Sequence, residues 1–306
     1  MNRRETLQRI VTFAAGAVLP RTAHAQMKAE AKIHTRAIPA SGERLPVIGL
    51  GTWQTFDVDS SASARAPLRE VLEAFADQGG RVIDSSPMYG RSEEVVGDLK
   101  AGLPQASNLF IATKVWTTGK AAGIRQMEDS MRRLRVEAVD LMQVHNLLDV
   151  DTHLDTLDRW KAEGRVRFTG VTHYTASGAQ EIARVIDRRK VDFVQINYSV
   201  AERAAEERLL PLAHERGIAV IANRPFAGGE MFARLRGKPL PRWAGDIDCT
   251  TWAQLLLKFV VSHPAMTCAI PASAKVEHTR DNMRGGYGRM PDERMRKAIV
   301  EAVGAA

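Results

Sequence analysis

Cysteine is scarce in this sequence of 306 residues, which contains only Cys249 and Cys268. Two cysteines are too few for a disulfide framework, so we expect two free thiols, with a single disulfide as the alternative. No Cys and His residues have the spacing of a zinc site, and we expect no metal. A metal-dependent barrel hydrolase would need clustered ligands at strand ends, where only His145 and Asp84 qualify.

A concentrated basic region is also absent, although the net charge is +7. Lys and Arg are spread along the whole chain, without a lysine-rich tail or an interleaved aromatic stripe. This distribution is typical of a solvated surface and does not indicate a nucleic-acid partner, while a local basic pocket for a phosphate is compatible with it. The 44% hydrophobic and 26% charged fractions are those of a globular protein with enough apolar side chains for a large core.

Long hydrophobic runs are missing, apart from a short one at the N-terminus. Residues 1–25 carry the adjacent Arg3 and Arg4, an apolar run from Ile10 to Leu19, and then Ala23-His24-Ala25, which has the small-x-small form of a signal-peptidase site. The run is too short for a membrane anchor, which needs about 20 residues. We therefore predict a signal peptide over residues 1–25, a polar linker over residues 26–35, and no stable membrane anchor.

The leader itself is similar to a twin-arginine export signal. The segment from Asn2 to Gln8 keeps Arg3, Arg4 and Leu7, and it departs from the usual pattern at Thr6 and Gln8. The resemblance implies that the export machinery carries the protein to the periplasm. A cytoplasmic protein with a disordered N-terminal extension is the alternative.

Strand-like and helix-like segments alternate along the remaining chain. Two extended stretches between Arg36 and Leu45, joined by a turn at residues 40–43, predict a β-hairpin. Eight strand-like runs follow: Val47–Leu50, Val82–Asp84, Leu109–Lys114, Val139–His145, Arg167–Thr172, Phe193–Asn197, Ala219–Asn223 and Thr267–Pro271. The helix-like stretches between them are Pro67–Gln78, Ser92–Leu99, Ile124–Leu134, Leu154–Glu163, Ser177–Asp187, Glu206–Arg216, Thr251–Ser262 and Val276–Met283.

Eight β/α repeats without an interdomain linker predict one domain over residues 36–306. The fold class is α/β, a (β/α)8 TIM barrel with an N-terminal β-hairpin. A doubly wound open sheet is the alternative, but the segment from Gly49 to Trp53 lacks the third glycine and the following helix of a dinucleotide fingerprint. The long interval from Gly228 to Cys249 is predicted to be an active-site loop.

Four ionisable residues end or follow consecutive predicted strands. Asp84, Lys114 and His145 close the second, third and fourth strands, and Tyr89 follows Asp84 by five positions. Each residue alone is often structural, as a turn cap or a core side chain. In a parallel barrel, however, the carboxyl ends of the strands form the rim that carries the catalytic groups. Four such residues on one rim predict a catalytic site.

A family resemblance is carried by the segments that contain these residues. The stretch from Arg81 to Gly97 resembles the first signature of the aldo-keto reductases. The segments Ile111–Trp116, Asp140–His145 and Gln195–Tyr198 are also similar to that family. The resemblance extends in order from Ile38 to Asn282, and it implies an enzyme that transfers hydride between a nicotinamide cofactor and a carbonyl.

The resemblance implies a role for each of the four residues. Tyr89 is the general acid-base, and Lys114 lowers its pKa. Asp84 holds Lys114, and His145 orients the substrate carbonyl. A free tyrosine titrates near about 10, so a buried ammonium beside it would bring its pKa toward the working range. Hydride must come from a cofactor, because no side chain can donate it.

Cofactor contacts are also implied by the resemblance. Thr172, His173 and Gln195 correspond to residues that bind the nicotinamide carboxamide, with His173 in place of the usual Asn. The segment Asn223-Arg224-Pro225-Phe226 replaces a stacking Tyr found in many members. Arg224 either lies over the nicotinamide ring or reaches the pyrophosphate, and Phe226 can supply an apolar face.

The segment from Ile270 to Lys275 resembles a pocket for the adenosine 2′-phosphate. The residues that correspond to this pocket are Ser273, Lys275, His278 and Asn282. Ser273 and Asn282 match the family pattern, whereas Ala272 and His278 occupy positions where Lys and Arg are common, and Lys275 or Arg280 can compensate. We therefore expect NADP(H) in preference to NAD(H).

Two tryptophans follow predicted strands, and we expect Trp53 and Trp116 to wall the substrate pocket, with rim packing as the alternative. The predicted function is reduction of aldehydes, ketones or sugars, with a small-molecule carbonyl as the substrate. A cofactor-binding sensor or partner subunit, like the potassium-channel β-subunits of this fold, is the alternative that the altered nicotinamide site and the leader suggest.

Overall fold

The computed structural model describes residues 32–175 and 177–305. The predicted signal peptide, and the predicted linker up to residue 31, lie outside these residues. The described unit begins at Lys32, before the expected start at Arg36. Ile33 packs against the hydrophobic core, and the backbone N–H of His34 donates to the carbonyl of Gly286 at 2.8 Å. The last part of the predicted linker therefore belongs to the fold.

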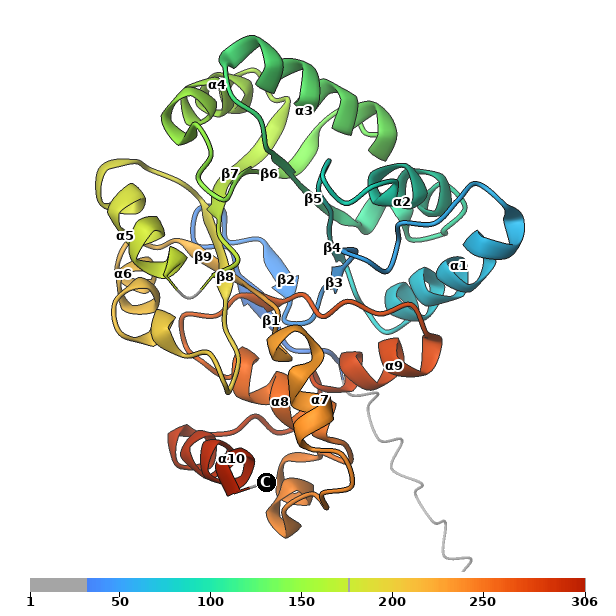
Figure 1. Cartoon of the computed structure of the whole chain (residues 1–306), viewed down its shortest axis with the longest axis vertical. Coiled ribbons are helices and arrows are strands. Elements are labelled where there is room, and N and C mark those ends of the chain that lie inside the picture. Colours follow the sequence, from blue (N-terminus) through green and yellow to red (C-terminus); the bar gives the residue numbers. More distant parts are fainter. Residues whose placement is uncertain (1–31, 176, 306) are drawn as a thin grey trace, which may run out of the picture. The chain divides into compact units, whose positions relative to one another are not determined.

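The predicted N-terminal hairpin is confirmed. Strands β1 (Thr35–Ala37) and β2 (Arg44–Pro46) pair antiparallel, and Gly42 supplies the left-handed turn between them with φ +76°. Ile38 and Leu45 are fully buried in one cluster with barrel residues such as Phe110, near the start of its strand. The hairpin therefore covers the amino-terminal end of the barrel, and its blue strands cross the centre of the ring in Figure 1.

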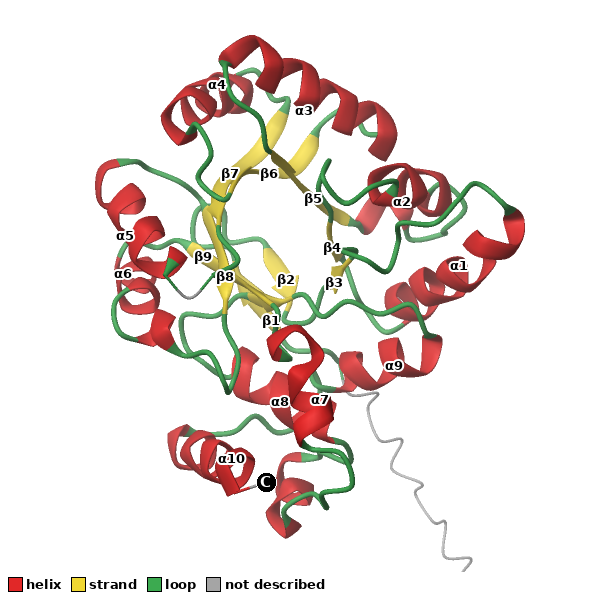
Figure 2. Ribbon diagram, viewed as in Figure 1, coloured by secondary structure: helices red, strands yellow, loops and turns green. Residues whose placement is uncertain are grey.

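Eight parallel strands form the barrel, which confirms the predicted fold class (Figures 1 and 2). They are β3 (Leu50–Gly51), β4 (Val82–Asp84), β5 (Phe110–Val115), β6 (Val139–His145), β7 (Val166–Thr172), β8 (Phe193–Asn197), β9 (Ala219–Asn223) and β10 (Cys268–Ala269). Each strand pairs with the next in sequence. Bridges from Ile48 to Ala269 and from Gly51 to Ala272 join the first strand to the last, so the sheet closes on itself.

Helices surround the strands, as Figure 2 shows in red. Those of the β/α repeats are α1 (Ala62–Asp77), α2 (Ser92–Lys100), α3 (Lys120–Leu134), α4 (Val150–Ala162), α5 (Gly178–Arg188), α6 (Leu209–Glu215), α8 (Trp252–Val261) and α9 (Val276–Arg284). All eight match predicted segments, with shifted ends. Helix α1 begins five residues before the predicted Pro67, because the Ser61 hydroxyl caps it by accepting from the N–H of Ala64 at 3.3 Å.

The interval from Gly228 to Cys249 is not a simple loop. It contains most of η3 (Ala227–Gly229), then α7 (Glu230–Arg234) and η4 (Arg242–Ile247). Two further short helices, η1 (Ala106–Asn108) and η2 (Ala204–Glu206), lie elsewhere in the chain. Helices of a single turn are too short to show a periodic pattern of apolar residues, so the sequence pattern did not predict them.

A C-terminal helix, α10 (Glu293–Ala305), was not predicted. Its Ile299 and Val303 are buried, and Arg296 fixes it to the barrel. The guanidinium of Arg296 donates to the Tyr198 hydroxyl at 2.6 Å and stacks on the Phe259 ring at 4.3 Å. These partners lie far away in sequence, so the sequence around α10 gives no sign of them.

Cys249 and Cys268 are both buried free thiols. The expectation of two unpaired thiols is therefore confirmed, and the alternative of a disulfide is excluded. Within the described residues, no helix combines the length and the apolar character that a membrane crossing requires.

Candidate active site

The barrel rim brings Asp84 and Lys114 together in a buried ion pair. Asp84 ends β4, Lys114 lies near the end of β5, and their exposed fractions are 2% and 0%. Lys114 Nζ donates to Asp84 Oδ2 and to the Ser85 carbonyl, each at 2.7 Å. Burial acts to lower the pKa of Lys114, but the charge of Asp84, with the interactions of Asp84 and Tyr89 with the ammonium, outweighs it and raises the pKa. The lysine therefore keeps its positive charge.

Two glutamines surround the carboxylate of Asp84. The amide nitrogen of Gln143 donates to the Gln195 side-chain oxygen at 2.9 Å and lies 3.4 Å from Asp84 Oδ1. The amide nitrogen of Gln195 lies 3.5 Å from Asp84 Oδ2. Gln195 was predicted from the resemblance, but Gln143 was missed. The alternation of a strand points to Gln143, because it lies two positions before His145 and faces the same side.

Tyr89 lies in the turn after β4, above the ion pair. Its backbone N–H donates to the Ser86 carbonyl at 3.0 Å, and Lys114 Nζ lies 5.1 Å from the centroid of its ring. Burial raises the pKa of the Tyr89 hydroxyl; the ammonium of Lys114 opposes this, and the charge of Asp84 adds to it. Lys114 therefore acts to lower this pKa, as expected, but burial outweighs it; the net direction is upward, and Tyr89 keeps its proton at neutral pH.

His145 completes the group of four predicted catalytic residues. Its ring meets that of Tyr89 edge to face, with centroids 6.0 Å apart, and its Nδ1 lies 3.2 Å from the Ser86 hydroxyl. Burial, with the charges of Lys114 and His173, lowers the pKa of His145 to about 2. The imidazole is therefore neutral, as expected. If the Ser86 hydroxyl donates to Nδ1, the ring proton lies on Nε2 and is available to a ligand.

A cavity of about 570 Å³ opens onto these residues. It is lined by predicted site residues of three kinds: Asp84, Tyr89 and His145; Trp53 and Trp116; and Gln195 with Asn223, Arg224, Pro225 and Phe226. Lys114 lies behind Asp84 and does not line it. Six predicted cofactor residues also lie outside its wall: Thr172 at the end of β7, His173 after it, and Ser273, Lys275, His278 and Asn282 on and before α9.

The rim of this cavity is apolar. Five large apolar side chains stay exposed among residues 32–175 and 177–305, and all five line the cavity: Trp53, Met88, Trp116, Tyr174 and Phe232. The two tryptophans are 47% and 40% exposed, which supports the expected pocket wall over rim packing. Met88 and Tyr174 were not predicted, since they lie in loops whose course the sequence pattern does not fix. Phe232 lies on α7, inside the interval from Gly228 to Cys249 that was predicted to belong to the active site.

The predicted carboxamide residues lie side by side at the strand ends. His145 is paired with Thr172, and Thr172 with Gln195, in register across β6, β7 and β8. His173 follows, and its carbonyl accepts from the Asn223 amide nitrogen at 3.1 Å. The side-chain oxygen of Asn223 is buried and has no partner among the described residues. An acceptor of this kind suits the N–H groups of a carboxamide, so these residues fit a nicotinamide.

The predicted 2′-phosphate residues lie at α9, beyond Ala272, which lines the cavity. The Ser273 hydroxyl donates to the Lys275 carbonyl at 2.9 Å and accepts from its N–H at 3.2 Å. Lys275 and His278 are exposed, whereas Asn282 is buried. This group therefore lies outside the wall of the catalytic cavity.

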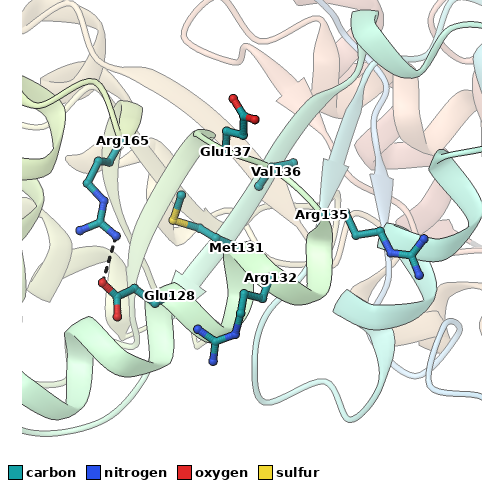
Figure 3. A pocket seen from close by; sticks show the side chains of 7 residues that line it. All are labelled: Glu128, Met131, Arg132, Arg135, Val136, Glu137 and Arg165. Atoms are coloured by element: carbon teal, nitrogen blue, oxygen red, sulfur yellow. Dashed lines mark hydrogen bonds and ion pairs between the residues drawn. The ribbon is translucent and has the colours of Figure 1, made fainter.

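A second pocket, of about 450 Å³, lies outside the barrel at the opposite ends of the strands (Figure 3). It is lined by residues of α3, of the turn before β6 and of the turn before β7: Glu128, Met131, Arg132, Arg135, Val136, Glu137 and Arg165. None of the predicted site residues is among them. Its arginines have carboxylate partners, such as Glu128 for Arg165 at 3.1 Å.

Comparison with known proteins agrees with this geometry. The model of the aldo/keto reductase family matches residues 47–299, which contain the whole barrel and all four catalytic candidates. The chain belongs to the aldo/keto reductase family. It is therefore an oxidoreductase, as expected from the resemblance.

Relatives within this family include reductases and cofactor complexes. The chain is 29% identical over 255 residues to methylglyoxal reductase YeaE of Escherichia coli, covering 81% of this chain and 88% of that protein. An aldo/keto reductase from Klebsiella pneumoniae, in complex with NADP and acetate, superposes with a TM-score of 0.69 at 30% identity, covering 84% of this chain and 91% of that one. A second from the same organism, in complex with NADPH, gives 0.70 at 28% identity, covering 89% and 94%.

Proposed function

We propose that this aldo-keto reductase uses NADP(H) to reduce aldehydes or ketones to alcohols, with Tyr89 as the proton donor. One observation carries the proposal: Tyr89, His145 and Asp84 line a single cavity, and Asp84 is paired with Lys114, which is buried behind it. The nicotinamide, when bound, supplies the hydride that goes to the carbonyl carbon. The proton that goes to the carbonyl oxygen comes from the Tyr89 hydroxyl.

The chain's own residues handle the proton and the developing charge. Tyr89 carries its proton at neutral pH, so it can donate to the oxygen as negative charge builds there. The ammonium of Lys114 stabilises the phenolate that remains. His145, being neutral, donates a hydrogen bond from Nε2 to the same oxygen. Asp84 keeps Lys114 charged although the ammonium is fully buried.

The cofactor would be held along the rim. Thr172, His173 and Gln195, with Asn223, are proposed to bind the carboxamide. Pro225 and Phe226 would form the apolar side of the cofactor site, and Arg224 would contribute a positive charge to it. At the far end, Ser273, Lys275, His278 and Asn282 would receive the adenosine phosphate. The NADP and NADPH complexes of the Klebsiella relatives support NADP(H) as the preferred cofactor, with NAD(H) as the weaker one.

The substrate is proposed to be a small-molecule carbonyl. The methylglyoxal reductase among the relatives makes 2-oxoaldehydes the first compounds to test, with aromatic aldehydes and sugars next. The experiment follows the loss of reduced-nicotinamide absorbance with NADPH, or NADH, and each carbonyl. Turnover with NADPH supports the proposal. Cofactor binding without turnover on any carbonyl would favour a sensor or partner subunit.

We also propose that the protein is exported to the periplasm by the twin-arginine route. The arginine pair, the short apolar run and the cleavage site over residues 1–25 support this proposal. Changing both Arg3 and Arg4 to Lys should trap the uncleaved precursor inside the cell, as measured by fractionation and immunoblotting. A mature form still found in the periplasm would contradict the twin-arginine route.

A further inference from the structure

Arg224 is a cation without a partner in the wall of the catalytic cavity. It follows β9 directly and lines the cavity together with Tyr89 and His145. Its Nε is buried and has no hydrogen-bond partner, and within the described part of the chain its guanidinium forms neither a hydrogen bond nor an ion pair. A guanidinium has five N–H donors and no acceptor, so its need for an acceptor has to be met by another group.

The arginines of the second pocket show the ordinary arrangement, and Figure 3 shows one of their ion pairs, between Arg165 and Glu128. Each has a carboxylate partner: Arg132 pairs with Asp129, Arg135 with Asp98, and Arg165 with Glu128. Those charges are balanced within the protein. The charge of Arg224 is not, although it is partly buried and lies beside the catalytic residues.

The backbone holds Arg224 in an unfavourable conformation. Its φ is +48°, in the left-handed region that a residue with a Cβ rarely adopts. Room for the guanidinium is provided by Gly228, where an added Cβ would lie 2.8 Å from Arg224 Nη2. Strained residues of this kind are concentrated where a side chain must be presented to a ligand.

We propose that Arg224 receives an anionic oxygen group of a ligand in the catalytic cavity. A carboxylate or phosphate matches the planar fork of a guanidinium and supplies the acceptor that Nε lacks. The group comes either from an acid group on the carbonyl substrate or from the pyrophosphate of the cofactor. This inference rests on the proposed function, since it assumes that both ligands enter this cavity.

The two sources are separated by an Arg224→Gln variant and two matched aldehydes, 4-carboxybenzaldehyde and 4-methylbenzaldehyde. If the substrate supplies the anion, kcat/KM measured at saturating NADPH should fall at least 10-fold more for the carboxylated aldehyde than for the other. If the cofactor supplies the anion, the affinity for NADPH should fall at least 10-fold. At saturating NADPH, the substitution should then change kcat/KM by the same factor for both aldehydes. The proposal would be overturned if the NADPH affinity and the kcat/KM values for both aldehydes all changed by less than 2-fold.

Two controls keep the result specific. Arg132→Gln removes the same charge at the second pocket and should leave all three quantities unchanged. Arg224→Lys keeps the charge but loses the fork, so it should restore only part of the lost affinity. Circular dichroism and urea unfolding of each variant verify that it is folded.

A binding measurement keeps the inference separate from the proposed activity. Calorimetry with inorganic pyrophosphate and with 4-carboxybenzyl alcohol requires no turnover. Binding of either probe to the wild type, and its loss in Arg224→Gln, would support the anion site even if no carbonyl is reduced, in which case only the proposed function fails. Absence of binding of both probes to the wild type, together with unchanged kinetics in the variant, would overturn the anion site.

Discussion

Lys114 Nζ lies 2.7 Å from Asp84 Oδ2, and both side chains are almost completely removed from solvent. The pair joins the ends of β4 and β5 directly beneath Tyr89. A buried ammonium is tolerated only when an opposite charge and further acceptors compensate for its lost hydration. Asp84 and the Ser85 carbonyl provide both. The charge that assists Tyr89 therefore depends on a residue that need not touch the substrate.

Asp84→Asn should destabilise the protein strongly. The substitution keeps the shape but leaves the ammonium of Lys114 buried without its counter-charge, for which a loss of roughly 3–5 kcal/mol is expected. The matched control is Asp151→Asn, which removes an exposed carboxylate paired with Arg188 and should cost at most about 1 kcal/mol. Urea unfolding measures both. Equal effects of the two substitutions would show that the buried pair has no special role.

The pH profile of reduction should be flat across neutral pH. His145 has its pKa lowered from 6.5 to about 2, so it stays neutral as the pH falls through the usual range of histidine. Tyr89 has its pKa raised, so it keeps its proton until the pH exceeds the usual tyrosine value of about 10. At saturating NADPH, kcat/KM for an aldehyde should be constant from roughly pH 5 to 9. A decline with a midpoint near 6.5 would mean that His145 titrates normally.

Gly178→Ala should weaken cofactor binding through His173. A Cβ at Gly178, in the first turn of α5, would lie 2.3 Å from the His173 ring, so the ring must move. We expect the Kd for NADPH to rise about 10-fold, equivalent to about 1.4 kcal/mol, as measured by tryptophan fluorescence quenching. Gly245→Ala is the control, because a Cβ there meets nothing within 4 Å. An unchanged Kd in Gly178→Ala would remove His173 from the cofactor site.

The sequence was informative where its signal is local and periodic. Strands such as β4, β6 and β8 follow directly from apolar runs, and the catalytic residues lie where those runs end. Helix α10 and the rim residue Tyr174 were missed, because contacts between distant segments place them. The direction of the Tyr89 pKa was also missed. It depends on a balance between burial, Lys114 and Asp84, and the extent of burial is known only once the chain is folded.

The central claim is that Tyr89 gives the proton to the carbonyl oxygen, and Tyr89→Phe tests it most directly. Phenylalanine keeps the ring beside His145 but has no hydroxyl, so kcat for aldehyde reduction should fall by about 10²–10⁴-fold. The Kd for NADPH should stay within about 2-fold, because the hydroxyl is assigned to the substrate oxygen. Initial rates of NADPH oxidation and fluorescence titration of the same preparation give both values. A large loss of kcat with an unchanged Kd is the predicted result, and a variant that retains wild-type turnover would contradict the mechanism.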